Sequence, residues 1–368
     1  MRMVEWKKMW ELTAWDKKFQ GVDKSMQSKI IPYTYLLAKD LFALAVPNGN
    51  IKLLSTGVQE GWTTEELAGD YLSEGEVVTI PWGKSPGAQN PVKYYKGKFV
   101  TGDNRIATSL DTNILNNKFL YYWMYSKSDI IETFYRGAGI QHPSMFKVLT
   151  MPVPLLSISE QERIVDILDT FTSSIDNLKQ QIAQRRKQYE YYRDKLIELT
   201  SKEWPSATLK DVATIKNGKD YKNLLKGNIP VYGSGGIMTY VDEYASEKPS
   251  VLLPRKGSVE NIFYVENPFW TVDTIYWTEI DTSKVLPKFL FYSLLKYNLK
   301  DFAYGGARPS LSQPILYKLE IPLPSLVEQQ RIVDILDKFE SCIQNLEAQL
   351  SQREKQYEYY RNKLLTFE

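Results

Sequence analysis

The clearest pattern in the chain is a stripe of apolar positions between Gln161 and Leu199. Its members are separated by steps of four and three residues in strict alternation, with one arginine among them. They are Ile164, Leu168, Phe171, Ile175, Leu178, Ile182, Arg185, Tyr189, Tyr192, Leu196 and Leu199. This spacing is typical of the seam of a coiled coil, and a helix carrying it would be about 54 Å long at about 1.5 Å per residue.

The same pattern returns 168 residues later, between Gln329 and Phe367. Aligned without a gap, the two 39-residue segments share 25 residues, and the second seam keeps the phase of the first. Its members are Ile332, Leu336, Phe339, Ile343, Leu346, Leu350, Arg353, Tyr357, Tyr360, Leu364 and Phe367. A single amphipathic stripe usually packs on a domain core. Two near-identical stripes favour a paired scaffold instead.

The charges beside the seams predict how the two helices pair. Lys179 and Arg186 occupy e positions of the first helix, whereas Glu340, Glu347 and Glu354 occupy e positions of the second. In an antiparallel pair e residues meet e residues, so opposite charges face each other only when the two helices of one chain pair. The alternative is a solvated face, because an exposed ion pair contributes only about 0–1 kcal/mol.

Antiparallel pairing would relate the two halves of the chain by a pseudo-two-fold axis. It would also hold the segments that precede each helix near opposite ends of the rod. Their separation would then be on the order of one to one and a half turns of B-DNA, at ~34 Å per turn.

The segment before the first helix is typical of a mixed domain. The opening, Met1–Asn48, suggests short helices and a turn. Apolar runs bounded by Gly and Pro follow, as in a small sheet with long loops, at Ile51–Leu54, Val77–Trp82 and Lys98–Thr101. The segment Asn117–Phe134 is typical of a helix.

The segment before the second helix repeats the later part of this order. Lys118-Phe-Leu faces Lys288-Phe-Leu at an offset of 170, while the upstream parts diverge. Ser157 with Glu160, and Ser325 with Glu328, are spaced as capping boxes that would start the helices at equivalent places. We therefore predict an α+β fold with a domain at 1–156, a helix at 157–201, a domain at 202–324 and a helix at 325–368.

The outward positions of the two helices are also identical, which packing inside a coiled coil does not require. One explanation is two copies of one partner protein, one docked on each helix, and the other is recent duplication. Because the domains have diverged over the same time, we favour docking. The residues concerned are Asp166, Asp169, Gln184, Lys187, Glu190 and Tyr191, with Asp334, Asp337, Gln352, Lys355, Glu358 and Tyr359 in the second copy.

Composition excludes several classes of protein. With 43% apolar and 24% charged residues the chain resembles ordinary soluble proteins, and we find no run of 18 apolar residues, so a cytoplasmic protein without membrane contact is expected. Cys342 and His142 are the only cysteine and histidine, which excludes intrachain disulfides and His- or Cys-rich metal sites. The net charge of +2 means that any nucleic-acid surface must be local.

No motif for catalysis stands out. Gly233-Ser-Gly-Gly236 lacks the spacing of a dinucleotide loop because Met238 occupies the last position, and Gly218-Lys219 lacks the flanks of a P-loop. A Ser-His-Asp triad would have to use His142, which no nucleophile elbow accompanies. We therefore expect a chain without catalytic residues.

Cationic and aromatic side chains gather instead on the Gly-containing loops of both domains. Arg and Lys can bind guanine edges or phosphates, and Gln can pair with adenine, although each residue taken singly is more often an ordinary surface residue. We assign DNA contacts to Lys84, Arg105, Arg136, Gln141 and His142 in the first domain, and to Lys216, Lys219, Lys222, Tyr232, Arg255, Lys256 and Arg308 in the second.

These features together resemble the specificity (HsdS) subunit of type I restriction–modification systems. The resemblance covers essentially the whole chain. Its strongest elements are the Glu-Gln-x-Arg-Ile-Val helices at Glu160–Val165 and Glu328–Val333, each after a Pro-x-Pro strand. The Lys-Asn-Gly-Lys-Asp and Ile-Pro-Val-Tyr-Gly-Ser-Gly-Gly segments of the second half add to it, whereas the first domain departs from the pattern by lacking them.

The resemblance implies two target-recognition domains, each reading one half of a split double-stranded DNA sequence. It implies that the helices form an antiparallel spacer that docks two modification subunits, which use S-adenosylmethionine to methylate adenine N6. Two restriction subunits, dependent on ATP and Mg, can join them. No cofactor is expected in this chain. The alternative function is a non-enzymatic coiled-coil adaptor that binds protein or nucleic acid without sequence specificity.

Overall fold

The structure is a computed structural model that describes residues 4–27, 29–85, 92–306 and 309–367, with the side chains of 199–203 excepted. The chain forms two compact units. Unit 1 comprises residues 1–177 and 351–368, and unit 2 comprises residues 178–350. Each unit therefore contains one of the predicted domains together with a stretch of both long helices.

The two long helices start where the serine caps predict. Helix α7 is Ile158–Glu203 and helix α11 is Leu326–Leu364. The Ser157 hydroxyl accepts a hydrogen bond from the Glu160 amide at 3.4 Å, and the hydroxyl of Ser325 accepts one from the amide of Glu328 at 3.3 Å. These contacts satisfy an amide that the first helical turn leaves without a partner.

Helix α11 ends sooner than predicted. The seam pattern runs to Phe367, but the helix stops at Leu364 because the next residues turn into the core of unit 1. Leu365 is buried there, and the Phe367 ring meets the Trp6 ring edge-on with centroids 6.4 Å apart. The last residue of the first predicted seam, Leu199, lies outside the described side chains.

Within each unit the two helices pair antiparallel. In unit 1 the Phe171 ring stacks on Tyr360 with centroids 5.3 Å apart, and in unit 2 the Tyr192 ring stacks on Phe339 at 5.6 Å. Phe171 and Phe339 occupy equivalent positions in the two repeats, as do Tyr192 and Tyr360. Each stack therefore joins the phenylalanine of one repeat to the tyrosine of the other. Unit 2 also contains one of the predicted e-to-e ion pairs, Arg186 to Glu347 at 2.5 Å.

Unit 1 is built on a six-stranded sheet in the order β2-β7-β5-β6-β3-β4. The strands of unit 1, including the separate pairs β1-β10 and β8-β9, are β1 (Glu5–Lys8), β2 (Thr13–Trp15), β3 (Ile51–Leu54), β4 (Gly61–Thr63), β5 (Ser73–Pro81), β6 (Lys93–Thr101), β7 (Asn104–Ser109), β8 (Tyr135–Arg136), β9 (His142–Pro143) and β10 (Pro152–Leu155). Its shorter helices are α1 (Met9–Leu12), α2 (Ala38–Ala43), α3 (Glu65–Ala68), α4 (Asn117–Ser126), α5 (Ser128–Glu132) and α6 (Met145–Leu149).

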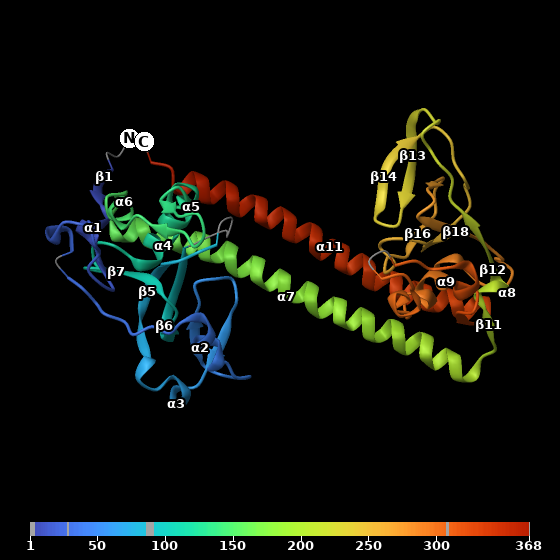
Figure 1. Cartoon of the computed structure of the whole chain (residues 1–368), viewed down its shortest axis with the longest axis horizontal. Helices are drawn as coiled ribbons and strands as arrows, with labels where there is room; N and C mark the ends of the chain where they lie inside the picture. Colours follow the sequence, from blue (N-terminus) through green and yellow to red (C-terminus); the bar gives the residue numbers. More distant parts are fainter. Residues whose placement is uncertain (1–3, 28, 86–91, 307–308, 368) are drawn as a thin grey trace. The chain divides into compact units, whose positions relative to one another are not determined.

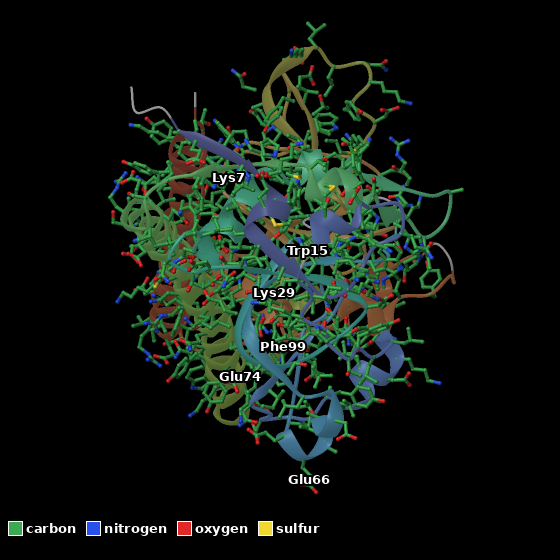
Figure 2. The ribbon with its side chains drawn as sticks, turned by 90° about the vertical axis from the view of Figure 1, so that its left-hand side faces the viewer. Lys7, Trp15, Lys29, Glu66, Glu74 and Phe99 are labelled. Atoms are coloured by element: carbon green, nitrogen blue, oxygen red, sulfur yellow. The ribbon has the colours of Figure 1, made fainter. Side chains whose placement is uncertain are left out.

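Two local predictions for unit 1 need correction. The opening segment contains strands as well as short helices, because β1 pairs antiparallel with β10 and β2 pairs with β7. The helix predicted over Asn117–Phe134 is divided into α4 and α5 at Lys127, whose backbone leaves the helical region. Figure 2 shows Trp15 and Phe99 set among these strands, both buried, and Glu66 at the outer end of the unit on α3.

Unit 2 has a four-stranded sheet in the order β12-β18-β15-β16, a three-stranded sheet in the order β14-β13-β17 and the antiparallel pair β11-β19. Figure 1 shows the β13–β14 hairpin standing away from the rest of the unit. The strands are β11 (Ser206–Thr208), β12 (Ala213–Asn217), β13 (Lys226–Gly233), β14 (Gly236–Val241), β15 (Ser250–Pro254), β16 (Phe263–Val265), β17 (Trp270–Thr271), β18 (Ile275–Ile280) and β19 (Glu320–Pro322), and the short helices are α8 (Leu209–Val212), α9 (Pro287–Leu294) and α10 (Gln313–Leu316).

The repeat shows in how each unit packs on its long helices. In unit 1, Phe119 and Leu120 of α4 are buried in one cluster with Ile164 and Leu168 of α7. In unit 2, Phe289 and Leu290 of α9 are buried with Ile332 and Leu336 of α11. Figure 1 shows α4 beside the first turns of α7, and α9 beside those of α11. Within the described ranges, no helix is long and apolar enough to cross a lipid bilayer.

Candidate nucleic-acid and partner interfaces

A short two-stranded ribbon gathers most of the predicted contact residues of unit 1. Arg136 of β8 lies opposite His142 of β9, and the backbones of Lys84 and Gln141 exchange hydrogen bonds of 3.1 and 2.9 Å. The segments from Lys84, from Arg136 and from Gln141–His142 therefore meet on one loop cluster. The side chains of Arg136 and His142 are exposed.

Trp82 links Arg105, the remaining predicted contact residue of unit 1, to this cluster. The guanidinium of Arg105 lies 4.4 Å from the centre of the Trp82 ring, and the His142 ring lies 4.9 Å from it, centroid to centroid. The Nδ1 atom of His142 is 2.8 Å from the Trp82 carbonyl oxygen, so that nitrogen carries the proton and donates.

Two of the predicted contact residues are buried, which corrects their assignment. The Arg105 side chain is only 3% exposed and forms ion pairs with Asp16 at 3.2 Å and Asp103 at 2.8 Å. The Lys84 side chain is also 3% exposed and pairs with Glu132. Charges held inside the domain in this way are neutralised by their partners, so the ion pairs of Arg105 and Lys84 give these side chains a structural role in holding the loops.

A cavity of about 530 Å³ lies beside this cluster and contains cations that sequence reasoning missed. Lys17 and Lys18 line it, and the Lys17 ammonium lies 5.1 Å from the centre of the Tyr35 ring. Tyr35 and Phe146 are exposed at its wall. The signal available in the sequence was the Lys-Lys pair directly after the buried Trp15-Asp16.

In unit 2 three of the predicted residues, Lys219, Arg255 and Lys256, lie against β17 and the turn that follows it. The amides of Arg255 and Lys256 donate to the carbonyl oxygen of Thr274 at 3.0 and 3.1 Å. The Lys219 amide donates to the carbonyl of Thr271 at 2.8 Å, and the amide of Ser234 donates to the Thr274 hydroxyl at 3.2 Å. One turn therefore brings the loops carrying Arg255, Lys256 and Lys219 together.

The glycine of the Lys-Asn-Gly-Lys-Asp segment is required by this packing. A Cβ atom added at Gly218 would lie 2.0 Å from the carbonyl oxygen of Val272. That distance is far inside van der Waals contact with backbone that cannot move aside, so only glycine lets the Lys219 loop approach the turn. The glycine of this motif is therefore explained by the packing of the loop, independently of the resemblance to a known family.

The predicted side chains of unit 2 are mostly accessible. Lys219, Lys222 and Lys256 are exposed. Lys256 pairs with Asp273 at 3.2 Å, and Arg255 lies over the Tyr276 ring at 5.7 Å.

The other predicted residues of unit 2 differ in accessibility. Lys216 is partly exposed and pairs with Glu279 at 3.0 Å. Tyr232 is half-buried against Phe263, and burial raises the pKa of its hydroxyl. Arg308 lies outside the described residues.

The predicted docking faces of the long helices are largely exposed. Tyr191 and Tyr359 are each 59% exposed, and each meets the following tyrosine edge-on with centroids 5.3 Å apart. The other exposed members are Asp166, Gln184, Lys187, Glu190, Asp334, Gln352, Lys355 and Glu358. The same accessible aromatic anchor therefore recurs in both copies.

Asp169 is not an outward residue as predicted. Its Oδ1 accepts a hydrogen bond from the Tyr122 hydroxyl at 2.6 Å, and its Oδ2 receives the Lys118 ammonium at 2.7 Å. The cause is that Lys118 and Tyr122 lie one turn apart on the face of α4 that packs on α7. Burial, and then the hydrogen bond to Asp169, raises the pKa of Tyr122.

Asp337 needs the same correction and has the same contacts. Its Oδ1 accepts from the Tyr292 hydroxyl at 2.5 Å and its Oδ2 receives the Lys288 ammonium at 2.9 Å. Burial, and then this hydrogen bond, raises the pKa of Tyr292. Both carboxylates therefore hold their own domain, and the remaining ten predicted docking residues are the accessible ones.

Sequence reasoning also missed a fully buried glutamine near the start of each long helix. The Gln161 amide nitrogen donates to the carbonyls of Ile114 and Leu156 at 2.8 and 2.9 Å, and its oxygen accepts from the Asn116 amide at 2.9 Å. The only sequence signal was its identity between the copies. We call Gln161 and Asp169, with the groups they bind, the polar mount of unit 1.

The polar mount of unit 2 consists of Gln329 and Asp337 with the groups they bind. The Gln329 amide nitrogen donates to the carbonyls of Lys284 and Pro324, both at 2.9 Å, and its oxygen accepts from the Leu286 amide at 2.8 Å. The two mounts are therefore built from equivalent residues in equivalent roles.

Comparison with known proteins gives concordant matches. Residues 39–185 and 201–354 match the family model described as type I restriction modification DNA specificity domain. A type I restriction enzyme specificity subunit of Haemophilus influenzae is 32% identical over 334 residues, which span 81% of this chain and 84% of that protein. The specificity subunit of the EcoR124I/EcoR124II enzyme of Escherichia coli is 29% identical over 72% of this chain and 74% of that protein.

Solved structures show the same fold. The S subunit of a type I restriction-modification system from M. genitalium superposes with a TM-score of 0.71 over 100% of this chain and 98% of its own, at 21% identity. A chain from a study of complex assembly in the type I system gives a TM-score of 0.51 at 15% identity, over 88% of this chain and 95% of its own.

Proposed function

The chain belongs to the family of type I restriction-modification specificity subunits, and from that premise we propose that it reads a bipartite DNA site. Each unit reads one half of the site through the loops at its surface. The long helices set the number of base pairs between the halves. In this proposal the chain contributes recognition and performs no chemistry.

One observation carries this proposal: unlike loops are held on like helices. Unit 1 presents the Arg136 and His142 ribbon, whereas unit 2 presents Lys219, Lys222 and Lys256 around a glycine-dependent turn. The polar mounts that hold the two domains are nevertheless equivalent. A DNA site made of two different half-sites separated by a gap requires two different DNA-binding domains held in equivalent positions.

The exposed faces of the two helices support two docking sites for one kind of methyltransferase subunit. Tyrosine is enriched among residues that dominate binding energy, because it buries a large area at low cost in side-chain entropy. Tyr191 and Tyr359 offer this anchor on α7 and α11, with the same charged neighbours in both copies.

The cofactors of the proposed reaction would belong to the partner subunits. A methyltransferase subunit would bind S-adenosylmethionine and methylate adenine N6, and restriction subunits would require ATP and Mg. This chain would position those partners on the DNA. A cytoplasmic location remains a prediction.

Band-shift assays on the complex of this chain with its methyltransferase subunits would test the proposal. The modified site is first identified by sequencing methylated adenines in a host with and without this gene. Changing bases in either half of that site should weaken binding, whereas changing bases in the gap should not. Binding that ignores the sequence of both halves would contradict the proposal and favour a nonspecific adaptor.

A further inference from the structure

Each domain is attached to its long helix at two polar points. Gln161 and Asp169 are eight residues apart on α7, which separates them by about 12 Å along the helix axis. Gln329 and Asp337 have the same separation on α11. A single attachment would let the domain rotate about it. Two attachments along one axis fix the position of the domain along the helix and its tilt relative to the helix axis.

The polar mounts are directional in a way that the apolar contact around them is not. Burial of apolar surface is favourable for many relative placements of two elements, whereas hydrogen bonds need defined distances and angles. Asp169 uses both carboxylate oxygens, and Gln161 uses both its nitrogen and its oxygen. A shift of the domain along the helix would leave these half-buried or buried groups without partners, which is costly.

The mounts are matched in further detail. The Lys118 ammonium that binds Asp169 lies 5.2 Å from the centre of the Tyr94 ring, and the Lys288 ammonium that binds Asp337 lies 5.7 Å from that of Tyr264. Tyr94 belongs to β6 and Tyr264 to β16. Such a cation over an aromatic face adds a third constraint on the lysine.

We propose that the polar mounts determine which gap length the protein accepts between its two half-sites. This inference rests on the proposed function. Successive base pairs are about 3.4 Å apart along the duplex. A domain that could slide or tilt on its helix by that amount would place its reading loops one base pair further in or out. The mounts prevent this, so a single gap is accepted.

The test uses the complete complex with its methyltransferase subunits, expressed in a host whose methylated adenines are then sequenced. Asp169→Asn removes one of the two strong acceptors at the mount, and Tyr122→Phe removes one hydroxyl while keeping the buried ring. Both variants should methylate the same half-site bases, but sites with a gap one base pair longer or shorter should reach at least about a tenth of the methylation at the wild-type gap. Asp176→Asn changes an exposed carboxylate on the same helix and should leave the gap unchanged.

The outcomes separate this inference from the function on which it rests. Variants that lose thermal stability but still modify a single gap would show that the mounts only stabilise the fold, and would overturn the inference. A wild-type complex that modifies no two-part site would contradict the proposed function itself. Because Tyr122→Phe is the milder change, it decides the question if Asp169→Asn fails to assemble.

Discussion

Burial separates side chains that look alike in the sequence. Arg105 and Arg136 are both arginines next to glycine-rich or acidic loops, and both suggest DNA contacts. Arg105 is enclosed by Asp16, Asp103 and Trp82, whereas Arg136 is exposed. The sequence does not reveal this difference, because it depends on which segment covers each loop in three dimensions.

Replacing Arg105 should therefore affect stability first. Arg105→Ala leaves the buried carboxylate of Asp16 without its partner, and we expect the free energy of unfolding to fall by about 3–5 kcal/mol. Arg136→Ala, the matched control, should change it by no more than about 0.5 kcal/mol while weakening DNA binding and lowering the slope of its salt dependence by about 1. Urea unfolding measures the stability of both variants, and band shifts at several salt concentrations measure their DNA binding. Equal stability of the two variants would contradict the assignment.

The polar mount of unit 1 also predicts a pH dependence. Because burial and the Asp169 hydrogen bond raise the pKa of Tyr122 above its usual 10.0, its contribution to stability is complete below that pH and is lost as the pH rises through the raised value. Asp169→Asn removes one raising cause and leaves burial, so the pKa of Tyr122 should fall yet stay above 10.0. Ring-carbon NMR of labelled tyrosine would follow this, and an unchanged titration would argue against the hydrogen bond.

At the scale of elements, the spacing of apolar residues and the charges beside the seams predicted more of the structure than the amino-acid composition did. The four-three alternation predicted both long helices, and the e-position charges predicted the antiparallel Arg186–Glu347 pair. The seam could not predict that Asp169 turns toward α4, since a carboxylate on a helix surface looks outward until the neighbouring element is known. The six-stranded sheet of unit 1 was only partly predicted, because the pairing of β2 with β7 joins residues more than 90 positions apart, as in Thr13 with Ser109.

Lengthening both helices should change the gap without changing the bases read. We would insert one seam-matched heptad between Asn177 and Leu178 and another between Leu350 and Ser351, where the two compact units divide. Seven residues add about 10.5 Å, the length of about three base pairs. Sequencing of methylated adenines should show the original half-sites with a gap longer by about three. Altered half-site bases would count against the helices as a spacer.

At the scale of the whole molecule, each compact unit combines one domain with stretches of both long helices. The halves of the sequence are therefore not the units of the fold. Unit 1 cannot be completed without Tyr360 and Leu365 from the end of the chain, and unit 2 requires Tyr192 from the first helix. This interleaving explains why the predicted domain boundaries follow the sequence repeat and the compact units do not.

The two exposed tyrosine anchors predict the stoichiometry of assembly. Tyr191→Ala and Tyr359→Ala should each weaken one methyltransferase docking site by about 2 kcal/mol, roughly 30-fold in Kd. Native mass spectrometry at limiting concentration should then show one bound subunit for each single variant and none for the double variant. Cys342→Ser, on the same helix as Tyr359, is a control that should keep two. Full occupancy in the double variant would place docking elsewhere.

Cys342 has a practical consequence of its own. It is the only cysteine of the chain and is exposed on α11. A maleimide dye would therefore attach at a single defined place in the unaltered protein, without the substitutions that labelling usually requires. Fluorescence anisotropy of that dye could follow binding of DNA, and energy transfer to a labelled duplex could report distances directly in solution.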